Sequence, residues 1–324
     1  MGYNSLMPVA SPYLYKTPKE IVEILKQRGL IFFDEAAAVE KLQETSYYSL
    51  RRYIGFFCSG KEKKFALGTE FKDIVRLYDF DRDLKALLLH ELLTFEAKLK
   101  STIGEVICSR YGTRERDYLN PAIFDQTTPA HVQKTINKIK NQKKLYGKSN
   151  QSLAYFKKKH AETIPFWVLA QVLTIGAVRD YFLALKTSDK DFISRRMLTD
   201  HSLKRKSGKM GSIVTLLADV RNMCAHDDVI LGYAHAKADI GVFPEHGILD
   251  LRKNKDGSLI QGRKDLMAVL ISLKYLSAKG DFEVFMGKLM TLVGSLEKSL
   301  FRVDAKKLLA FIGLSEDYAK LCTI

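Results

Sequence analysis

The chain has 324 residues, which is enough for a large core and for one or two domains. Hydrophobic residues make up 46% and charged residues 27%, a composition typical of soluble globular proteins and not of disordered or membrane-spanning ones. Lys and Arg number 52 against 37 Asp and Glu, a formal net charge of +15. This balance indicates a polyanionic partner, nucleic acid before a membrane surface, although a basic protein without such a partner has the same composition.

Four scattered cysteines form no C-x-x-C pair, which argues against a disulfide framework and against a zinc site. The first ten residues lack the basic and apolar regions of a signal peptide, and the longest nearly apolar run, 164–178, is too short for a membrane span. No P-loop, no G-x-S-x-G elbow and no H-E-x-x-H pair is present. We therefore expect a cytoplasmic protein with no membrane segment, no metal and no cofactor.

Two helix starts open the chain. Thr17-Pro18 combines a capping residue with Pro at the first helical position, and this helix should end at Gly29. Asp34 begins a second helix that runs to Glu44, and an aromatic block follows from Tyr47 to Phe57. These aromatics, beside Arg51 and Arg52, could stack on unpaired bases, but packing between helices is the favoured interpretation. We assign residues 1–68 to an N-terminal helical lobe.

Thr69 is expected to cap a short helix over 70–78, and a long helix should follow over about 81–110. The long helix is indicated by apolar residues at helical spacing: Leu84, Leu87, Leu88, Leu92, Phe95, Leu99 and Ile103. Glu96 and Lys100 lie four residues apart on it, and the ordinary interpretation is a surface ion pair.

Asn120-Pro121 and Thr128-Pro129 mark further helix starts, after which residues 126–161 contain no acid. This segment holds nine lysines: Lys134, Lys138, Lys140, Lys143, Lys144, Lys148, Lys157, Lys158 and Lys159. Lys134, Lys138 and Lys144 could share one helical stripe, and 141–152 should form an exposed loop. A lysine run is often only a solvated face, but the absence of acids favours a surface that binds RNA phosphates.

A buried helix is expected over 165–185 and another over 188–198. A second basic cluster follows and is also assigned to RNA binding: Arg195, Arg196, Lys204, Arg205, Lys206 and Lys209.

The next helix carries the most informative stretch of the chain, residues 216–227. On a helical wheel its core face consists of Ile213, Leu216, Leu217, Val220, Met223 and Cys224. Arg221 and His226 flank the opposite face, roughly 140° apart, with Asn222 between them.

This pair of residues suits cleavage of an RNA phosphodiester. An imidazole can accept the proton of the 2′-hydroxyl or protonate the leaving 5′-oxygen, and an Arg fork can stabilise the charge that builds on phosphorus. No metal is required, because the ribose supplies the nucleophile. The simpler alternative is that Arg221 pairs with Asp219 or Asp227 and that His226 merely ends the helix.

After His226, residues 229–263 are rich in Gly and β-branched residues, and Asn254 to Gly257 should form the turn of a small β-hairpin. His235 and His246 lie in this segment; they could be site residues, but the favoured interpretation is that they are surface histidines. Further helices should begin at Asp265, Asp281 and Asp304.

The stretch from Arg221 to His226 resembles the active-site motif of HEPN ribonucleases and, more narrowly, the AbiD/AbiF-type abortive-infection family of bacterial phage-defence proteins. Three other stretches carry the same resemblance, namely 46–53, 77–84, and 165–168 with 174–176. Such proteins continue after the His with a basic residue and a Trp, whereas this chain has Asp227 and Asp228.

The resemblance implies a mainly α, HEPN-like helical bundle over 69–324, with a basic insertion around 126–161 and a hairpin around 229–263. It implies a metal-independent endoribonuclease in which Arg221, Asn222 and His226 are catalytic, assembled as a homodimer from two copies of the motif. An acidic residue near Glu96 would orient the Arg. The alternative is a non-catalytic binder of a structured noncoding RNA in a toxin-antitoxin-like defence system.

Overall fold

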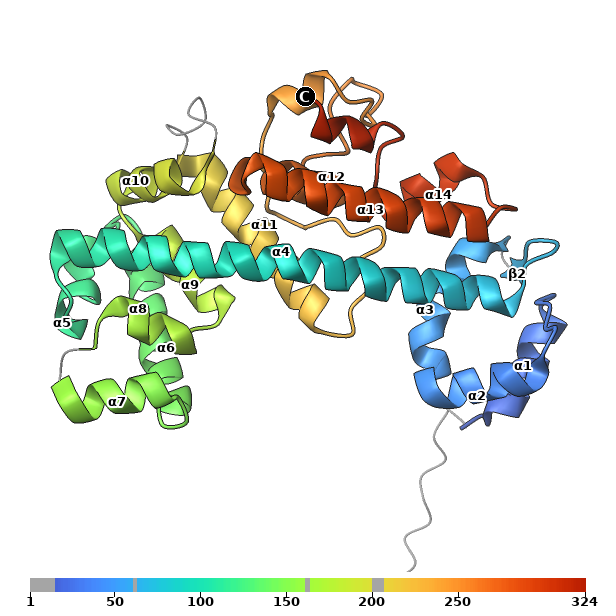
Figure 1. Ribbon diagram of the computed structural model, residues 1–324, viewed down its shortest axis with the longest axis horizontal. Coiled ribbons are helices and arrows are strands. Elements are labelled where there is room, and N and C mark those ends of the chain that lie inside the picture. Colours follow the sequence, from blue (N-terminus) through green and yellow to red (C-terminus); the bar gives the residue numbers. More distant parts are fainter. Residues whose placement is uncertain (1–14, 61–62, 161–163, 200–206) are drawn as a thin grey trace, which may run out of the picture. The chain divides into compact units, whose positions relative to one another are not determined.

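The computed structural model describes residues 15–60, 63–160, 164–199 and 207–324. The chain divides into two compact units, residues 1–80 and 81–324 (Figure 1). The division falls inside the longest helix, α4 (Phe71–Tyr111). Our sequence-based division at 68/69 lies nearby, at the residues that precede this helix.

The smaller unit contains α1 (Pro18–Gln27), α2 (Glu35–Thr45), α3 (Tyr47–Phe57) and the paired strands β1 (Cys58–Ser59) and β2 (Lys64–Phe65). The predicted starts of α1 and α2 are confirmed, because Thr17 forms a capping box with Glu20 and the Asp34 side chain caps α2. The aromatic rings of Tyr53, Phe56 and Phe57 are buried, which confirms the packing interpretation for these three; their neighbour Tyr48 is exposed.

The larger unit is mainly helical, which confirms the mainly α fold class. In chain order its further elements are α5 (Glu115–Tyr118), η1 (Pro121–Ile123), α6 (Pro129–Tyr146), α7 (Gln151–His160), α8 (Phe166–Leu169), η2 (Ala170–Val172), α9 (Ile175–Ala184), α10 (Thr187–Met197), α11 (Ser207–Ala225), η4 (Pro244–Gly247), α12 (Leu266–Leu276), α13 (Lys279–Ser299), α14 (Ala305–Ile312) and η5 (Tyr318–Cys322).

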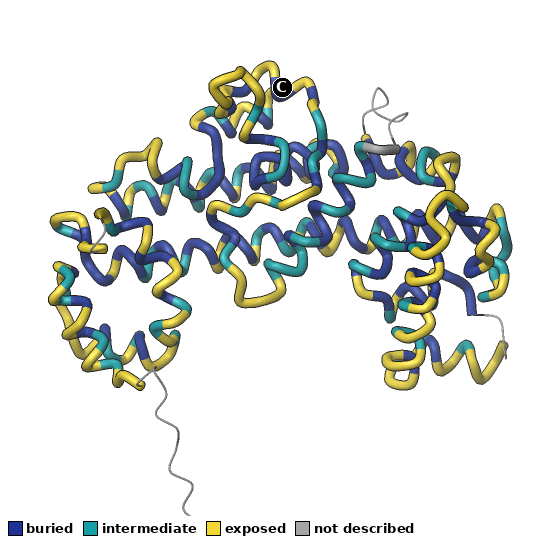
Figure 2. Tube along the Cα trace, turned by 180° about the vertical axis from the view of Figure 1, so that it is seen from behind, coloured by how far each residue is buried: buried dark blue, intermediate teal, exposed yellow. Residues whose placement is uncertain are grey.

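The core of this unit lies along α4, α11 and α12. Leu84, Leu88, Leu92, Leu99 and Ile103 of α4 are fully buried, as are the residues of α12 from Leu266 to Ile271 (Figure 2). Lys98 of α4 donates hydrogen bonds to the carbonyls at the ends of two other helices, Met197 of α10 (3.1 Å) and Leu276 of α12 (3.0 Å). Burial lowers the pKa of this lysine.

The prediction of a break between helices 70–78 and 81–110 is wrong, since α4 is continuous from Phe71 to Tyr111. Asp81, which we read as a helix start, has a fully buried carboxylate that contacts a distant segment of the chain. Its Oδ1 accepts hydrogen bonds from the backbone N–H groups of Ile230 (3.0 Å) and Leu231 (3.3 Å), and its Oδ2 pairs with Lys85 (3.3 Å). An aspartate that caps a helix and one that anchors a tertiary contact look alike in sequence.

The prediction of a single helix over 165–185 is also wrong. It divides into α8, η2 and α9, with an extended residue, Leu173, before the Thr174 cap of α9. The expected loop over 141–152 is shorter than predicted, because α6 continues to Tyr146 and α7 begins at Gln151.

The segment 229–263 is mostly irregular. The predicted turn is present, with Asn254 N–H donating to the Ser258 carbonyl (2.8 Å), but its arms are joined by one isolated bridge between Lys253 and Leu259. The paired strands lie instead in the smaller unit, where Cys58 pairs with Phe65 and Ser59 with Lys64. Among the residues that the structure describes, no helix combines the length and the apolar character that crossing a bilayer requires.

Candidate functional site

Arg221, Asn222 and His226 line one pocket of about 560 Å³ at the C-terminal end of α11. The predicted core face of this helix is confirmed for Ile213, Leu216, Leu217 and Val220, which are fully buried. Burial of one face turns Arg221 and Asn222 to the other side, where they are half-buried. The remaining lining residues are Glu96, Lys100, Tyr146, Ser149, Asn150, Gln171, Val172, Leu173 and Thr174.

Arg221 is held by a carboxylate from α4. Its Nε lies 2.9 Å from Oε2 of Glu96, and the Lys100 ammonium lies 2.7 Å from Oε1 of the same side chain. Glu96 is only 7% exposed, so the interpretation of Glu96 and Lys100 as a surface ion pair is wrong. The acid instead bridges two cations, and the carboxylate fixes one edge of the guanidinium.

His226 is exposed in the turn that follows α11, and its backbone N–H donates to the Met223 carbonyl (3.2 Å). The side chains of Asp227 and Asp228 are exposed as well. The backbone beyond them is tied to α4, because Lys85 donates to the Asp228 carbonyl (2.8 Å) and Asp81 accepts from Ile230 and Leu231. Asp227 and Asp228, the two residues that depart from the expected motif, therefore lie in a segment whose backbone is held by Lys85 and Asp81.

The nearby Cys224 is an unsuitable nucleophile. Burial raises the pKa of this thiol to about 12, which keeps it protonated at neutral pH.

Two walls of the pocket come from segments that the sequence analysis did not assign to the site. The end of η2 and the break before α9 supply residues 171–174, and the end of α6 and the turn before α7 supply Tyr146, Ser149 and Asn150. Gln142 joins the walls, because its Oε1 accepts from the Thr174 N–H (3.0 Å) and its Nε2 donates to the Thr174 hydroxyl (2.9 Å). The sequence signal that could have located this wall is Thr174, a threonine that caps the helix beginning at Ile175.

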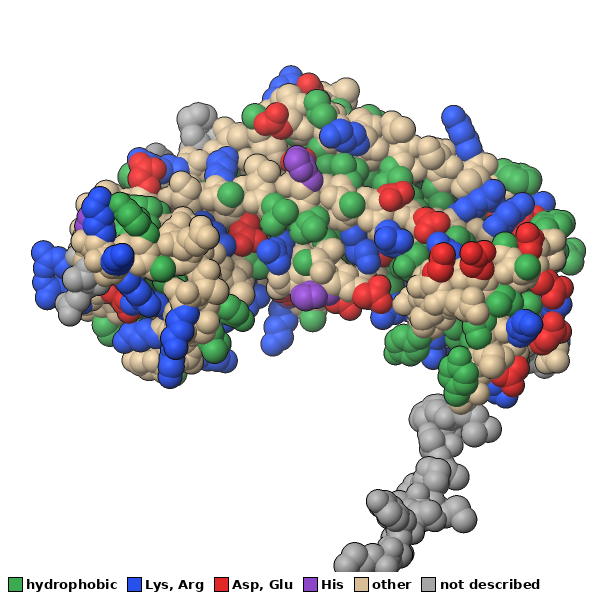
Figure 3. All heavy atoms as spheres, turned by 60° about the horizontal axis from the view of Figure 1, so that its bottom comes forward, with side chains coloured by type: hydrophobic (Ala, Val, Ile, Leu, Met, Phe, Trp, Pro, Cys, Tyr) green, Lys and Arg blue, Asp and Glu red, His purple; other side chains and the backbone are tan. Residues whose placement is uncertain are grey.

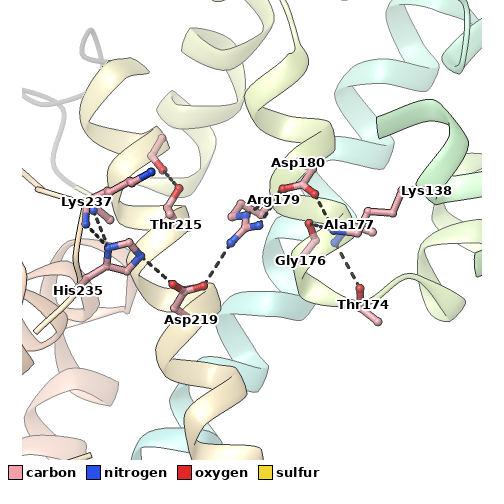
Figure 4. Close-up of polar contacts among 12 residues, drawn as sticks. Lys138, Thr174, Gly176, Ala177, Arg179, Asp180, Thr215, Asp219, His235 and Lys237 are labelled. Atoms are coloured by element: carbon pink, nitrogen blue, oxygen red, sulfur yellow. Dashed lines mark hydrogen bonds and ion pairs between the residues drawn. The ribbon is translucent and has the colours of Figure 1, made fainter. Parts of the chain in front are cut away.

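A chain of polar contacts positions α9 between α6 and α11 (Figure 4). Asp219 of α11 contacts Arg179 of α9 (3.2 Å) and Nε2 of His235 (2.7 Å), whereas the carboxylate that contacts Arg221 is Glu96 and not Asp219, the partner in the simpler alternative. His235 Nδ1 accepts the backbone N–H groups of Lys237 (2.9 Å) and Ala238 (2.7 Å), which leaves Nε2 as the donor to Asp219.

The interpretation of both later histidines as surface residues is wrong. His235 is largely enclosed by the contacts just described. His246 is buried, with Nε2 lying 2.7 Å from the Gly262 carbonyl. Both rings stabilise the irregular segment after α11 and neither lines the pocket.

On the other side of α9, Lys138 of α6 lies 2.6 Å from Asp180 and 3.1 Å from the Gly176 carbonyl (Figure 4). Burial raises the pKa of Asp180, but the hydrogen bond from Lys138 and the charge of Arg179 outweigh it, so the pKa lies below its ordinary value. Lys138 thus faces α9 and does not share an exposed stripe with Lys134 and Lys144.

The predicted basic residues divide into those that lie on the surface and those that other groups hold, and Arg196, in the second set, is itself exposed. Those on the surface are Lys134, Lys140, Lys144, Lys148, Lys157, Lys158, Lys159 and Arg195. Those held by other groups are Lys138, Lys143 (by Glu115), Arg196 (by Glu105) and Lys209 (by the Val242 carbonyl and, 4.2 Å away, the Phe243 ring). Lys204, Arg205 and Lys206 lie outside the described residues. Many Lys and Arg side chains gather over the part of this unit that holds α6 and α7, at the left of Figure 3.

We expect Lys134→Ala and Lys138→Ala to have different effects on the free energy of unfolding. Loss of Lys138 leaves Asp180 without its closest cation and should lower the free energy of unfolding by about 1–2 kcal/mol. Loss of Lys134, which is exposed, should change the free energy of unfolding by less than about 0.5 kcal/mol. Urea unfolding of both variants checks this, and equal stability of the two would contradict the assignment of Lys138.

Residues 40–231 match the family model of Abi-like proteins. This match covers more than half of the chain and includes α4, the α6–α9 region and the whole motif from Arg221 to His226. Searches of the curated proteins and of the solved structures found no match. The chain therefore belongs to the Abi-like protein family, a family of abortive infection.

Proposed function

We propose that the protein is a metal-independent endoribonuclease of the HEPN type that acts in bacterial defence against phages. The observation that carries the proposal is the pocket lined by Arg221, Asn222 and His226, in which Glu96 forms an ion pair with the Arg221 guanidinium. The family match supports a role in abortive infection. The exposed lysines of α6 and α7 support RNA as the substrate.

In the proposed reaction the 2′-oxygen of a ribose attacks the adjacent phosphorus, and the bond from phosphorus to the 5′-oxygen breaks. A 2′,3′-cyclic phosphate and a 5′-hydroxyl result. His226 takes the 2′-hydroxyl proton or gives a proton to the leaving oxygen. Arg221 stabilises the additional negative charge on the phosphoryl oxygens, and Asn222 orients the imidazole or the phosphate.

One chain supplies one Arg221 and one His226, whereas the reaction needs both a base and an acid. A homodimer in which two copies of the motif face a shared cleft provides two imidazoles, one for each proton transfer. The exposure of His226 suits such an arrangement, since a second copy can approach it.

Expression in growing cells tests the proposal. Induced wild-type protein should arrest growth and fragment cellular RNA, while His226→Ala should do neither at the same protein level. RNA ends that carry a cyclic phosphate or its 3′-phosphate product would match the proposed chemistry. If the His226→Ala protein arrests growth and fragments RNA as wild type does, the proposal is wrong.

Glu96 is a positioning residue in this scheme, and Glu96→Gln should lower kcat for RNA cleavage about 10- to 100-fold, because Arg221 loses its fixed orientation. KM should stay the same or fall, since the pocket loses its negative charge. Glu105→Gln is the matched control, as Glu105 is an exposed acid of the same helix that pairs with Arg196 outside the pocket. Wild-type kcat in Glu96→Gln would contradict this role.

The exposed lysines also favour a second candidate, a non-catalytic binder of a structured noncoding RNA in a toxin-antitoxin-like system. A pure binder should lose affinity, and show a shallower dependence on salt, when the lysines of α7 are neutralised. It should be indifferent to His226→Ala. The two candidates are therefore separated by the effect of this one substitution.

A further inference from the structure

One aromatic side chain stands out in the pocket of Arg221 and His226. Tyr146, the last residue of α6, lines this pocket and is 50% exposed, although it belongs to a helix whose other face is buried. In the part of the chain that the structure describes, no other ring and no cation packs on it. A large ring in a polar pocket is a feature that the core does not require.

The turn that presents Tyr146 is built with little freedom. A Cβ at Gly147 would lie 2.3 Å from the Lys143 carbonyl oxygen and 2.9 Å from the Leu153 side chain, so only glycine fits this close approach. The Ser149 hydroxyl donates to the Tyr146 carbonyl (3.1 Å). Gln142, one turn earlier on α6, is bonded to Thr174 on the opposite wall. The ring is therefore attached to a backbone that is fixed relative to the pocket.

Neutral polar groups accompany the ring. Asn150 Oδ1 accepts the Leu153 N–H (2.9 Å) at the start of α7, which leaves the Nδ2 amide as the donor that a ligand can use. Gln171, on the other wall, is exposed and carries both a donor and an acceptor. The charged residues that line the pocket, Glu96, Lys100 and Arg221, form one connected cluster.

The ring, the amides and the charged cluster of this pocket each match one part of a nucleotide. The cations suit a phosphate, a planar ring suits the face of a base, and amides suit the edge of a base. A base is free to stack on a protein ring only when it is unpaired, because the faces and the edge of a paired base are occupied in a duplex. The volume of about 560 Å³ is in the range of pockets that hold small molecules of nucleotide size.

We infer that Tyr146 stacks on an unpaired base next to the bond that is cut, and that Asn150 and Gln171 contact the edge of this base. Tyr146 is then the residue that restricts the substrate to single-stranded RNA. The inference rests on the proposed function, since it assigns a substrate class to the same pocket.

RNA binding, measured without cleavage, tests this assignment. The His226→Ala chain is titrated with a short unstructured fluorescent RNA and with a hairpin whose stem has the same sequence. We expect the unstructured RNA to bind more tightly, and we expect an added Tyr146→Ala to weaken this binding by about tenfold or more while the hairpin is little affected. Tyr146→Phe, which keeps the ring, should bind as the parent does.

Tyr155→Ala is the matched control. Tyr155 has a similar exposure (54%) and lies on the neighbouring helix α7, but it is absent from the pocket lining and its ring is held by Lys159. Its loss should leave the discrimination between the two RNAs unchanged. The fluorescence of a 2-aminopurine RNA should be quenched by the parent chain and by its Tyr146→Phe variant alike, and not by Tyr146→Ala.

The inference is overturned if the hairpin binds as well as the unstructured RNA, if neither RNA binds, or if Tyr146→Ala and Tyr155→Ala behave alike. These outcomes are separate from those that decide the proposed function. Cleavage that depends on His226 can persist while Tyr146 proves irrelevant, and a binder that is not a nuclease can still depend on Tyr146.

Discussion

Replacing His226 by alanine is expected to lower the rate of RNA cleavage by about 10²- to 10⁴-fold, the contribution typical of a positioned general acid or base. Single-turnover cleavage by purified protein measures it, because product release then does not mask the chemical step. The melting temperature should be unchanged, since the ring is exposed beyond the end of α11 and leaves no cavity when it is removed.

Two further variants sharpen this prediction. His90→Ala removes another exposed histidine, on α4 and outside the pocket, and should cleave as wild type does. Arg221→Lys keeps the charge but loses the planar fork that Glu96 grips, so it should recover only part of the activity that Arg221→Ala loses. Cleavage at the wild-type rate by His226→Ala would remove this residue from the mechanism.

Asp81→Ala should lower the free energy of unfolding by about 3–5 kcal/mol, the largest stability effect that we expect from a single side chain in this protein. The Asp81 carboxylate is 0% exposed and accepts the backbone N–H groups of Ile230 and Leu231 while it pairs with Lys85. Alanine would leave two donors and one ammonium without this acceptor inside the protein. Urea unfolding followed by circular dichroism is the appropriate measurement.

Controls for Asp81→Ala come from the same turn of α4. Asp83 lies two residues further on and is exposed, so Asp83→Ala should change stability by less than about 0.5 kcal/mol. Asp81→Asn keeps an oxygen for the two N–H groups but loses the charge opposite Lys85, and it should fall between Asp81→Ala and wild type. A stability of Asp81→Ala close to that of Asp83→Ala would show that the anchor contributes little.

Asp81 also connects stability with the candidate site. The segment that it holds begins four residues after His226, and Lys85 holds the Asp228 carbonyl between them. The motif helix α11 is thus tied to α4 through Glu96 in the pocket, and the segment that follows α11 is tied to α4 through Asp81 and Lys85. Partial loss of cleavage in Asp81→Asn, under conditions where it remains folded, would be consistent with this arrangement.

Local signals in the sequence were sufficient for most helix starts. Thr17, Asp34, Asp265 and Asp304 each cap a helix at or next to the predicted residue. The apolar spacing of α4 and α11 identified their buried faces. A cap or an amphipathic face is made by residues within one or two turns of each other, and the information therefore lies in a short stretch of chain.

The same local signals failed where a distant segment supplies the partner. Asp81 resembles a helix cap but accepts from Ile230 and Leu231, and Lys138 resembles part of a surface stripe but pairs with Asp180. Glu96 and Lys100 have the spacing of a surface pair, yet Glu96 is buried and its carboxylate contacts Arg221 of α11 as well as Lys100. Spacing along the chain carries no information about which of these partners is present.

The sequence by itself determined the mainly α fold class, the buried face of the motif helix, and Arg221, Asn222 and His226 as the candidate site. Only the tertiary structure decided which groups surround them: Glu96 and Lys100 from α4, Tyr146 from the end of α6, Gln171 from η2, and Thr174 from the break before α9. These segments are distant in sequence and are brought together by the burial of their apolar faces. This burial is not directional, so the apolar pattern alone does not specify which polar side chains become neighbours. The identity of the groups that share a pocket is therefore a property of the packed chain.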